Sequence, residues 1–139
     1  SLVGDVKQVN QNKFVNKITI SLFDYSKSGK TLALSPGDQK VRLVSVKDVV
    51  NGYCQAMNLF NPEQKGFNID YSLTTEKLYS IKEIIELFNK YSSNKVKVDF
   101  GKKQYREREV MVAYETTNIL PNWHPNNSDL EDFFKVACK

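Results

Sequence analysis

The arginines of the segment Tyr105-Arg106-Glu107-Arg108-Glu109 are the side chains of this sequence best suited to binding an anion. A guanidinium group donates two parallel hydrogen bonds, which matches the geometry of phosphate oxygens. Arginines that alternate with glutamates are also typical of a solvated loop, where exposed ion pairs contribute little. The segment taken alone favours the solvated loop, so a binding role for Arg106 needs support from the rest of the chain.

A tyrosine and a lysine four positions apart, Tyr91 and Lys95, have the spacing of a catalytic pair in which the lysine lowers the tyrosine pKa. This chemistry requires both side chains on one face of a helix. The intervening residues 92–94, Ser-Ser-Asn, end the preceding helical pattern, and Lys95 begins a strand pattern. We interpret the spacing as chance and expect no catalytic residue in this chain.

The cysteines and the histidine are too widely separated to predict a metal site. Cys54 and Cys138 lie on the apolar faces of two helical patterns, which predicts buried, reduced thiols rather than a disulfide. His124 lies in a loop, where we expect a surface histidine. Reduced thiols and the lack of a visible signal peptide predict a cytoplasmic protein.

The composition predicts one globular domain with a modest core. The chain has 139 residues, of which 40% are hydrophobic and 26% charged. No run approaches the roughly 18 apolar residues of a membrane span, so we expect no membrane partner. The net charge of +4 permits an anionic partner. Basic residues alternate with acidic ones, and no aromatic RNA-binding strand motif occurs, so we expect no nucleic-acid binding.

The segment 40–58 reads as a buried strand followed by an amphipathic helix. Residues 43–46 favour the strand, and Asp48 is predicted to cap the helix. One helical face is apolar and carries Val50, Tyr53, Cys54 and Met57. A strand that leads directly into a helix is half of a β–α–β unit and predicts a neighbouring parallel sheet. The remaining residues supply little of such a sheet.

Capping boxes predict two further helices. Ser80 and Glu83 begin a helix that we expect to end near Tyr91, and Ser128 and Glu131 begin the last helix. Short strands are predicted over residues 31–34, 66–70, 96–100 and 110–114. Residues 12–23 fit either a helix or a strand.

The order of these segments resembles a known family. The segments are Val3-Gly4-Asp5, KFVNKI, LALSPGDQ, LVSVKDVVNGY, GFNID, YSIKEIIELF, VKVDFG, YREREVMV and LPNWHPNNSDLEDFF. In this order and spacing the chain resembles the C-terminal part of an extended short-chain dehydrogenase/reductase, the NAD-dependent sugar-nucleotide epimerase/dehydratase family. The resemblance covers nearly the whole chain and rests on several weak motifs together. The LALSPGDQ and REREVMV segments further resemble reductases that make CDP-linked dideoxyhexoses.

The resemblance implies an α/β fold. Residues 1–139 are expected to form a small mixed α/β substrate-binding domain that lacks most of the Rossmann sheet, with segment 40–58 packing on the missing Rossmann domain. In the family that domain holds NAD or NADP and the Tyr-x-x-x-Lys pair. The glycines of this chain are isolated, so we expect it to bind no cofactor itself.

The resemblance also implies the substrate contacts. The family places an arginine against the substrate diphosphate at the position of Arg106, and an acidic residue near the same site at the position of Glu109. It lays the nucleotide base over the strand that contains Leu32 and Leu34, for which an ordinary core strand is an equal alternative. Further contacts are implied at the start of a helix, at Lys13 and Phe14.

A departure from the family occurs at Val41-Arg42, where the family has Arg-Asp and that arginine often touches phosphate. Arg42, or Lys40, could substitute from a neighbouring position. A shift of one residue along a strand turns the side chain to the opposite face, which puts this contact in question.

The expected function is therefore a nucleotide-sugar-binding domain whose parent is an NAD(P)-dependent epimerase, dehydratase or reductase acting on a nucleotide-linked hexose. The chain alone is expected to be inactive. Its expected partners are a nucleotide-diphosphate sugar and either the missing Rossmann half or a second copy of the chain. The alternative is a non-catalytic binding or interaction module derived from the same fold.

Overall fold

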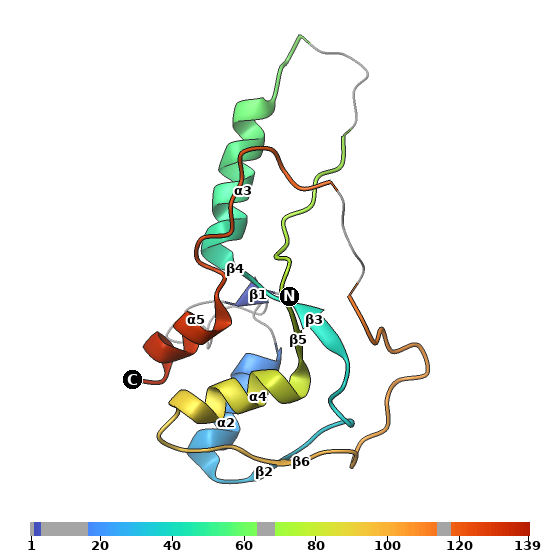
Figure 1. Cartoon of the computed structure of the whole chain (residues 1–139), viewed down its shortest axis with the longest axis vertical. Coiled ribbons are helices and arrows are strands. Elements are labelled where there is room, and N and C mark those ends of the chain that lie inside the picture. The colour runs from blue at the N-terminus through green and yellow to red at the C-terminus, as the bar shows by residue number, and fades with distance from the viewer. Residues whose placement is uncertain (1, 4–16, 64–68, 114–117) are drawn as a thin grey trace.

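The computed structural model describes residues 2–3, 17–63, 69–113 and 118–139. Its elements in chain order are β1 (Leu2–Val3), α2 (Lys17–Ser28), β2 (Thr31–Ala33), β3 (Lys40–Arg42), β4 (Val44–Ser45), α3 (Val46–Leu59), β5 (Leu78–Ser80), α4 (Ile81–Tyr91), β6 (Lys97–Asp99) and α5 (Leu130–Ala137). Helices α2, α4 and α5 gather at one end of the molecule, and α3 extends toward the other end (Figure 1). The mixed α/β class is as predicted.

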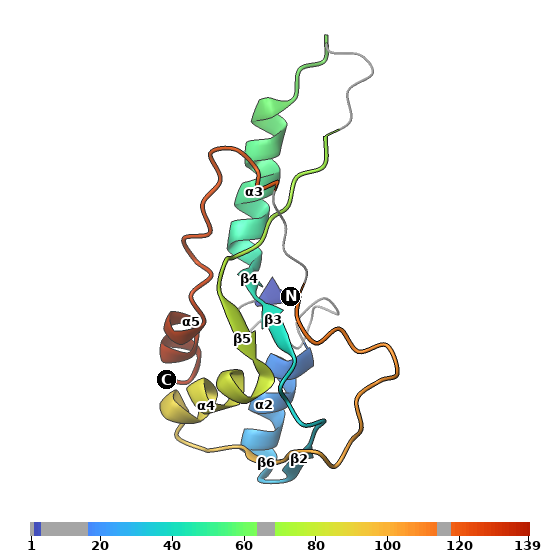
Figure 2. The ribbon, with the colours of Figure 1, turned by 45° about the vertical axis from the view of Figure 1, so that its right-hand side comes forward.

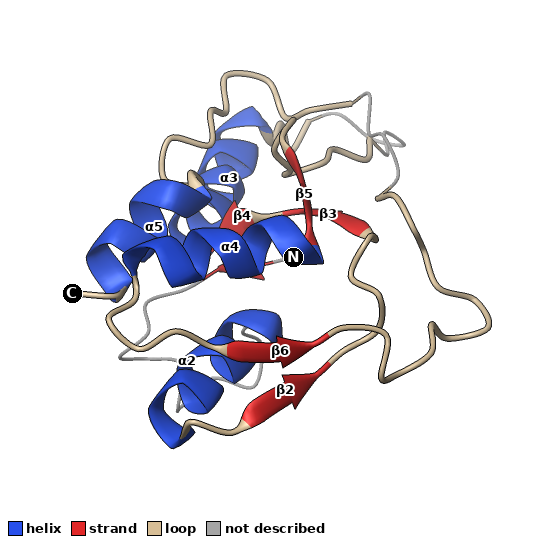
Figure 3. Ribbon diagram, turned by 60° about the horizontal axis from the view of Figure 1, so that its bottom comes forward, coloured by secondary structure: helices blue, strands red, loops and turns tan. Residues whose placement is uncertain are grey.

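The described strands form three two-stranded pairs. Strand β1 pairs in parallel with β4, β2 pairs in parallel with β6, and β3 pairs antiparallel with β5. Figure 3 shows β2 and β6 side by side next to α2. Lys40 of β3 also forms a parallel bridge with Val112. This bridge is what the structure shows of the strand predicted over residues 110–114.

The main core lies where α2, α4 and α5 meet. Phe88 is fully buried, and its ring makes edge-to-face contacts with Phe23 and Phe134 at centroid distances of 5.0 and 5.5 Å. Such contacts add to the stabilisation from burying apolar area. The buried members of this core are Leu22, Leu32, Leu43, Tyr79, Ile84, Ile85, Phe88, Val96, Leu130 and Phe134. The helix α2 resolves the ambiguity of residues 12–23 in favour of a helix from Lys17 onward.

Helix α4 confirms the first capping box. The Ser80 hydroxyl accepts a 3.1 Å hydrogen bond from the Glu83 amide, and the Glu83 carboxylate accepts one of 2.6 Å from the Ser80 amide. Both otherwise unpaired donors at the helix start are thereby satisfied. The helix ends at Tyr91, as predicted, and its buried residues are Ile84, Ile85 and Phe88.

The second capping box was wrong. Helix α5 is capped by Asp129, whose carboxylate accepts from the Asp132 amide at 2.9 Å. The Ser128 hydroxyl instead donates to the Asp48 carboxylate. The Glu131 carboxylate accepts from Tyr91 and Lys90 on α4. Long-range partners therefore took both side chains away from the local capping arrangement.

Helix α3 begins earlier than predicted. Its N-cap is Ser45, whose side chain accepts from the Asp48 amide at 3.1 Å. Asp48 therefore lies in the first turn and is not the cap. The segment predicted as one strand over 43–46 is split, since β4 covers only Val44–Ser45 and Val46 is already helical.

The apolar face of α3 is exposed. Its members are Val50, Tyr53 and Met57, with 53%, 67% and 68% of their surface accessible. Cys54 is also exposed, which corrects the prediction of a buried thiol. The helix packs instead through the face that contains Gly52. Gly52 lies so close to Leu73 that a Cβ atom on it would come within 2.6 Å of the Leu73 side chain.

Asp48 anchors the loop before α5 to the start of α3. Its buried carboxylate accepts hydrogen bonds of 2.8 Å from the backbone and side-chain nitrogens of Asn127 and one from the Ser128 hydroxyl. The Trp123 indole donates to the Asp48 carbonyl at 2.8 Å. Burial raises the pKa of Asp48, but the hydrogen bonds from Ser128 and Asn127 outweigh burial and lower it overall. Trp123 thus has a structural role.

The remaining expectations concern chain segments that the structure describes in part. Most of the strand predicted over 66–70 lies outside the described residues, and Ile69 and Asp70 are not in a strand. Among the helices of the described ranges, none combines the length and the apolar character needed to cross a bilayer.

Candidate functional site

The loop over residues 101–113 carries Arg106 and is tied to the body on both flanks. On its first flank, the Lys103 amide donates to the Leu34 carbonyl at 3.1 Å. The Tyr105 hydroxyl accepts a 3.0 Å hydrogen bond from the Asp38 amide. These two contacts fix the start of the loop against the turn that follows β2.

The second flank of the loop lies along β3. The Lys40 amide donates to the Met111 carbonyl at 2.7 Å, and the Ala113 amide donates to the Lys40 carbonyl at 3.1 Å. The Arg42 guanidinium donates to the Ala113 carbonyl at 3.0 Å. Figure 2 shows the loop, in orange, running outward from β6 and returning toward β3. The loop therefore projects from the body between two fixed ends.

Arg106 is exposed in the middle of this loop. Its carbonyl accepts a 3.0 Å hydrogen bond from the Glu109 amide, which closes a turn around residues 106–109. Arg108 is exposed and Glu109 is half-buried. An exposed guanidinium on an anchored loop is available to an anionic ligand without the cost of desolvating a buried charge.

The two leucines expected under a nucleotide base lie in different environments. Leu32 is 6% exposed and belongs to the main core, with its partner Val98 across the strand pair. Leu34 is half-buried and lies just beyond β2, where its carbonyl accepts from Lys103. A ligand at this edge would therefore meet Leu34 before Leu32. Lys13 and Phe14, also expected to contact substrate, lie outside the described residues.

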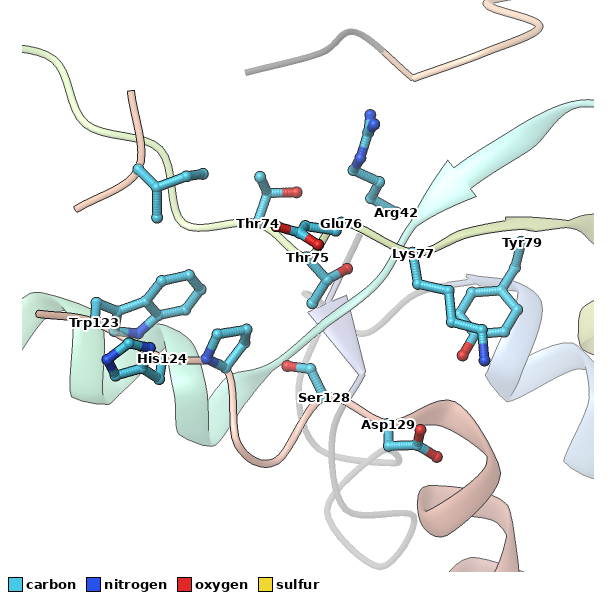
Figure 4. Close-up of a pocket in the computed structure, with 12 residues that line it drawn as sticks. Arg42, Thr74, Thr75, Glu76, Lys77, Tyr79, Trp123, His124, Ser128 and Asp129 are labelled. Atoms are coloured by element: carbon cyan, nitrogen blue, oxygen red, sulfur yellow. The ribbon is translucent and has the colours of Figure 1, made fainter. Parts of the chain in front are cut away.

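Arg42 lines a separate cavity. Val41 packs against the main core, and Arg42, its neighbour on β3, lies on the opposite face. The cavity there has a volume of about 770 Å³. Figure 4 shows Arg42 beside the 74–77 segment, with Trp123 and His124 on another wall. The one-residue shift noted in the sequence therefore turns the cation away from the core side of the strand.

Opposite charges lie close to the first anchor of the loop. Lys82 of α4 forms a 2.7 Å ion pair with Asp38. The hydrogen bond to Asp38 raises the pKa of Lys82, although partial desolvation opposes it. The positive charge of Lys82 offsets the negative charge of the Asp38 carboxylate. Without Lys82, this carboxylate would repel an anion near the loop.

The described residues do not fit the pyrophosphate of a dinucleotide cofactor at the strand-to-helix junction of β4 and α3. A dinucleotide site needs a glycine-rich turn that brings backbone amides to the pyrophosphate. Here the helix start carries the Asp48 carboxylate, covered by Asn127 and Ser128. The buried negative charge would oppose a phosphate at this position.

The Tyr91 and Lys95 spacing does not form a helical pair in the structure. Helix α4 ends at Tyr91, and Lys95 lies beyond the cap, in the turn that leads to β6. The Tyr91 hydroxyl donates instead to Glu131. Hydrogen bonds from Tyr91 and Lys90 lower the pKa of Glu131 to about 2. These side chains link α4 to α5.

Sequence reasoning missed two features that shape the site. Neither the Asp38–Tyr105 contact nor the Asp48–Asn127 contact has a local signal, since their partners are separated by 67 and 79 positions. The glycine at Gly37, with its positive φ of 85°, was a signal for the turn but not for what the turn contacts.

The comparisons with known proteins find similarity to enzymes that act on nucleotide sugars. No family model matches the chain. The chain is 31% identical over 110 residues to a CDP-abequose synthase from Yersinia pseudotuberculosis. The aligned region covers 78% of this chain and 38% of that protein.

Solved structures of UDP-glucose 4-epimerases share the fold at low sequence identity. The UDP-glucose 4-epimerase from Brucella ovis in complex with NAD has a TM-score of 0.70 at 16% identity, covering 88% of this chain and 40% of that one. The UDP-glucose 4-epimerase from Thermotoga maritima with UDP-glucose has a TM-score of 0.69 at 18% identity, covering 99% and 42%. This chain thus spans about two fifths of the length of these proteins.

Proposed function

This chain is a homologue of the NAD-dependent sugar-nucleotide epimerases of the extended short-chain dehydrogenase/reductase family, and from this premise we propose that it binds the diphosphate of a nucleotide sugar. The parent protein is then an NAD(P)-dependent epimerase, dehydratase or reductase acting on a nucleotide-linked hexose. On this proposal, hydride and proton transfer belong to the Rossmann part of the family fold. This chain supplies the binding surface.

The observation that carries the proposal is the anchored loop with its exposed arginine. The resemblance puts Arg106 at the position where the family binds phosphate, and the loop that holds it is tied to Leu34 and Lys40 on its two flanks. Leu34 accepts the hydrogen bond from Lys103 that begins the loop, so on this proposal the base lies over Leu34 at the first anchor and the diphosphate lies farther along the loop at Arg106. A bidentate guanidinium contact supplies both charge and orientation.

The other expected ligand contacts take subordinate places in this proposal. Arg42 donates to the Ala113 carbonyl at the far end of the same loop and lines the separate cavity, so its contact with phosphate stays a prediction. Glu109 follows the turn that Arg106 begins. Lys13 and Phe14 stay predictions.

We propose that the exposed face of α3 packs on the Rossmann part of the parent enzyme. The strand before α3 pairs in parallel with β1, and parallel strands normally lie in larger sheets that helices cover on both faces. The face formed by Val50, Tyr53 and Met57 is apolar and carries no charge. Such a stripe is typical of a helix that covers a sheet.

Calorimetric titration of the chain with CDP-, UDP-, GDP- and dTDP-linked hexoses tests the proposal. We expect saturable binding of one nucleotide. The CDP-linked sugar is the first expectation, because the curated relative is a CDP-abequose synthase. Lack of binding to all four would count strongly against a nucleotide-sugar site.

The role of Arg106 is tested by Arg106→Gln. Loss of a charged hydrogen-bonding pair should weaken binding about 10- to 100-fold. The matched control is Arg108→Gln, which removes the same charge from an exposed arginine of the same loop. Equal weakening by both variants would indicate a general charge effect and would remove the specific assignment to Arg106.

A further inference from the structure

Tyr105 precedes Arg106 and holds the loop at its first flank. Its ring is half-buried, and its hydroxyl oxygen accepts the 3.0 Å hydrogen bond from the Asp38 amide. Among the described residues, the next backbone contact that ties the loop to the body is at Met111. The placement of Arg106 between these ties therefore depends on the Tyr105 contact more than on any contact of its own side chain.

The turn that receives Tyr105 is itself fixed. Gly37 has a positive φ of 85°, and a Cβ atom there would come within 2.8 Å of the Phe100 ring. The Gly37 carbonyl accepts a 3.2 Å hydrogen bond from the Lys82 amide at the start of α4. The Asp38 carboxylate pairs with the Lys82 ammonium group at 2.7 Å. The anchor of the loop is thus connected to α4, whose buried residues belong to the main core.

The hydroxyl hydrogen of Tyr105 remains available to donate a hydrogen bond, because the contact with Asp38 uses only the oxygen. A phenol accepts with its oxygen and donates with its hydrogen, and here the oxygen accepts from a backbone amide. Because the Tyr105 oxygen accepts from the Asp38 amide, the Tyr105 ring is held in one position relative to the turn at Asp38. The adjacent backbone, and with it the origin of the Arg106 side chain, is fixed by the same contact.

We infer that Tyr105 is a positioning residue that sets the Arg106 guanidinium for the substrate diphosphate. The inference rests on the proposed function. It assigns specificity for the diphosphate to a three-part connection in which Lys82 holds Asp38, the Asp38 backbone holds Tyr105, and Tyr105 places Arg106. The ion pair with Lys82 also reduces the repulsion between Asp38 and an incoming phosphate.

The variant Tyr105→Phe tests this inference, because it keeps the ring and deletes the accepting oxygen. We expect it to weaken binding of the nucleotide sugar about fivefold, as the loss of one hydrogen bond does. In the Arg106→Gln background the same change should cause no further weakening, since the group that Tyr105 positions is gone. The matched control is Tyr71→Phe, at an exposed tyrosine that belongs neither to the loop nor to the α3 face.

A second measurement does not depend on the ligand. Backbone nitrogen-15 relaxation should show increased sub-nanosecond motion over residues 104–110 in Tyr105→Phe, with the amides of α4 unchanged. Unchanged loop motion overturns the inference even if no nucleotide sugar binds. If the wild-type chain binds a nucleotide sugar and Tyr105→Phe binds it equally well, the inference fails while the proposed function stands. The same holds if Tyr105→Phe lowers the affinity of the Arg106→Gln variant as much as it lowers that of the wild type. If no nucleotide sugar binds the wild-type chain, the proposed function fails and the positioning for a diphosphate fails with it.

Discussion

Helices α3 and α4 are both amphipathic and both begin at a serine cap, yet they present their apolar faces in opposite ways. Helix α4 buries Ile84, Ile85 and Phe88 in the main core. Helix α3 leaves its apolar face open and packs through Gly52 and Val49 instead. Amphipathic periodicity therefore predicts that a helix has an apolar face, but it does not predict which part of the protein buries that face.

The contrast also separates two sources of stability. In α4 the stabilisation comes from apolar area and ring contacts in the core. In α3 the contacts at the helix start come from hydrogen bonds to the Asp48 carboxylate and carbonyl. Helix α4 is held mainly by packing in the main core, whereas the start of α3 is also fixed by a buried polar cluster, so the two helices should respond to different perturbations.

The largest expected effect tests the packed helix. Phe88→Ala removes a ring that is fully buried between two others, and we expect the free energy of unfolding to fall by about 3–5 kcal/mol. Val50→Ala on the open face of α3 should change it by less than about 0.5 kcal/mol. Urea denaturation of both variants measures the difference. A comparable loss in Val50→Ala would mean that the α3 face is covered in solution.

The next effect tests the polar cluster. Asp48→Asn removes the charge that the Asn127 and Ser128 donors stabilise, and we expect a loss of about 1–3 kcal/mol at neutral pH. Because the folded-state pKa of Asp48 is lowered, its contribution is complete above the ordinary value of 3.8 and is lost as the pH falls through the lower folded value.

The measurement for Asp48 is the denaturation midpoint between about pH 5 and pH 2. The wild-type chain should lose more stability on acidification than Asp48→Asn. Asp24→Asn, at an exposed position on α2, serves as the control and should follow the wild type. Parallel acid profiles for the wild type and Asp48→Asn would contradict the role of this cluster.

The smallest effect on folding, but a large one on association, is expected on the open face of α3. The double variant Tyr53→Glu/Met57→Lys should change the free energy of unfolding by less than about 0.5 kcal/mol, because both side chains are exposed. It should reduce self-association at high concentration, as measured by sedimentation velocity. Val136→Lys, at an exposed position of α5, is the control for added charge. A wild-type chain that stays monomeric at all concentrations would contradict self-association through the α3 face.

Local signals in the sequence determined several elements well. The Ser80 and Glu83 pair predicted the start of α4, and the polar residues after Tyr91 predicted its end. The order of weak motifs indicated the family, and the comparisons bear this out. The ends of α4 depend on residues within one or two helical turns of each other, and the family resemblance depends on the order of short motifs along the chain, so both are visible in the sequence.

Contacts between distant residues were decided by the tertiary structure alone. Ser128 has the spacing of a helix cap but donates to Asp48, because that buried carboxylate needs donors more than the α5 start does. The apolar face of α3 is open because the described strands around it form only a pair, β1 with β4. The sequence by itself determined which side chains could bind an anion. The placement of Arg106 on a loop held by Asp38 and Lys40 was decided by hydrogen bonds between segments far apart in the chain.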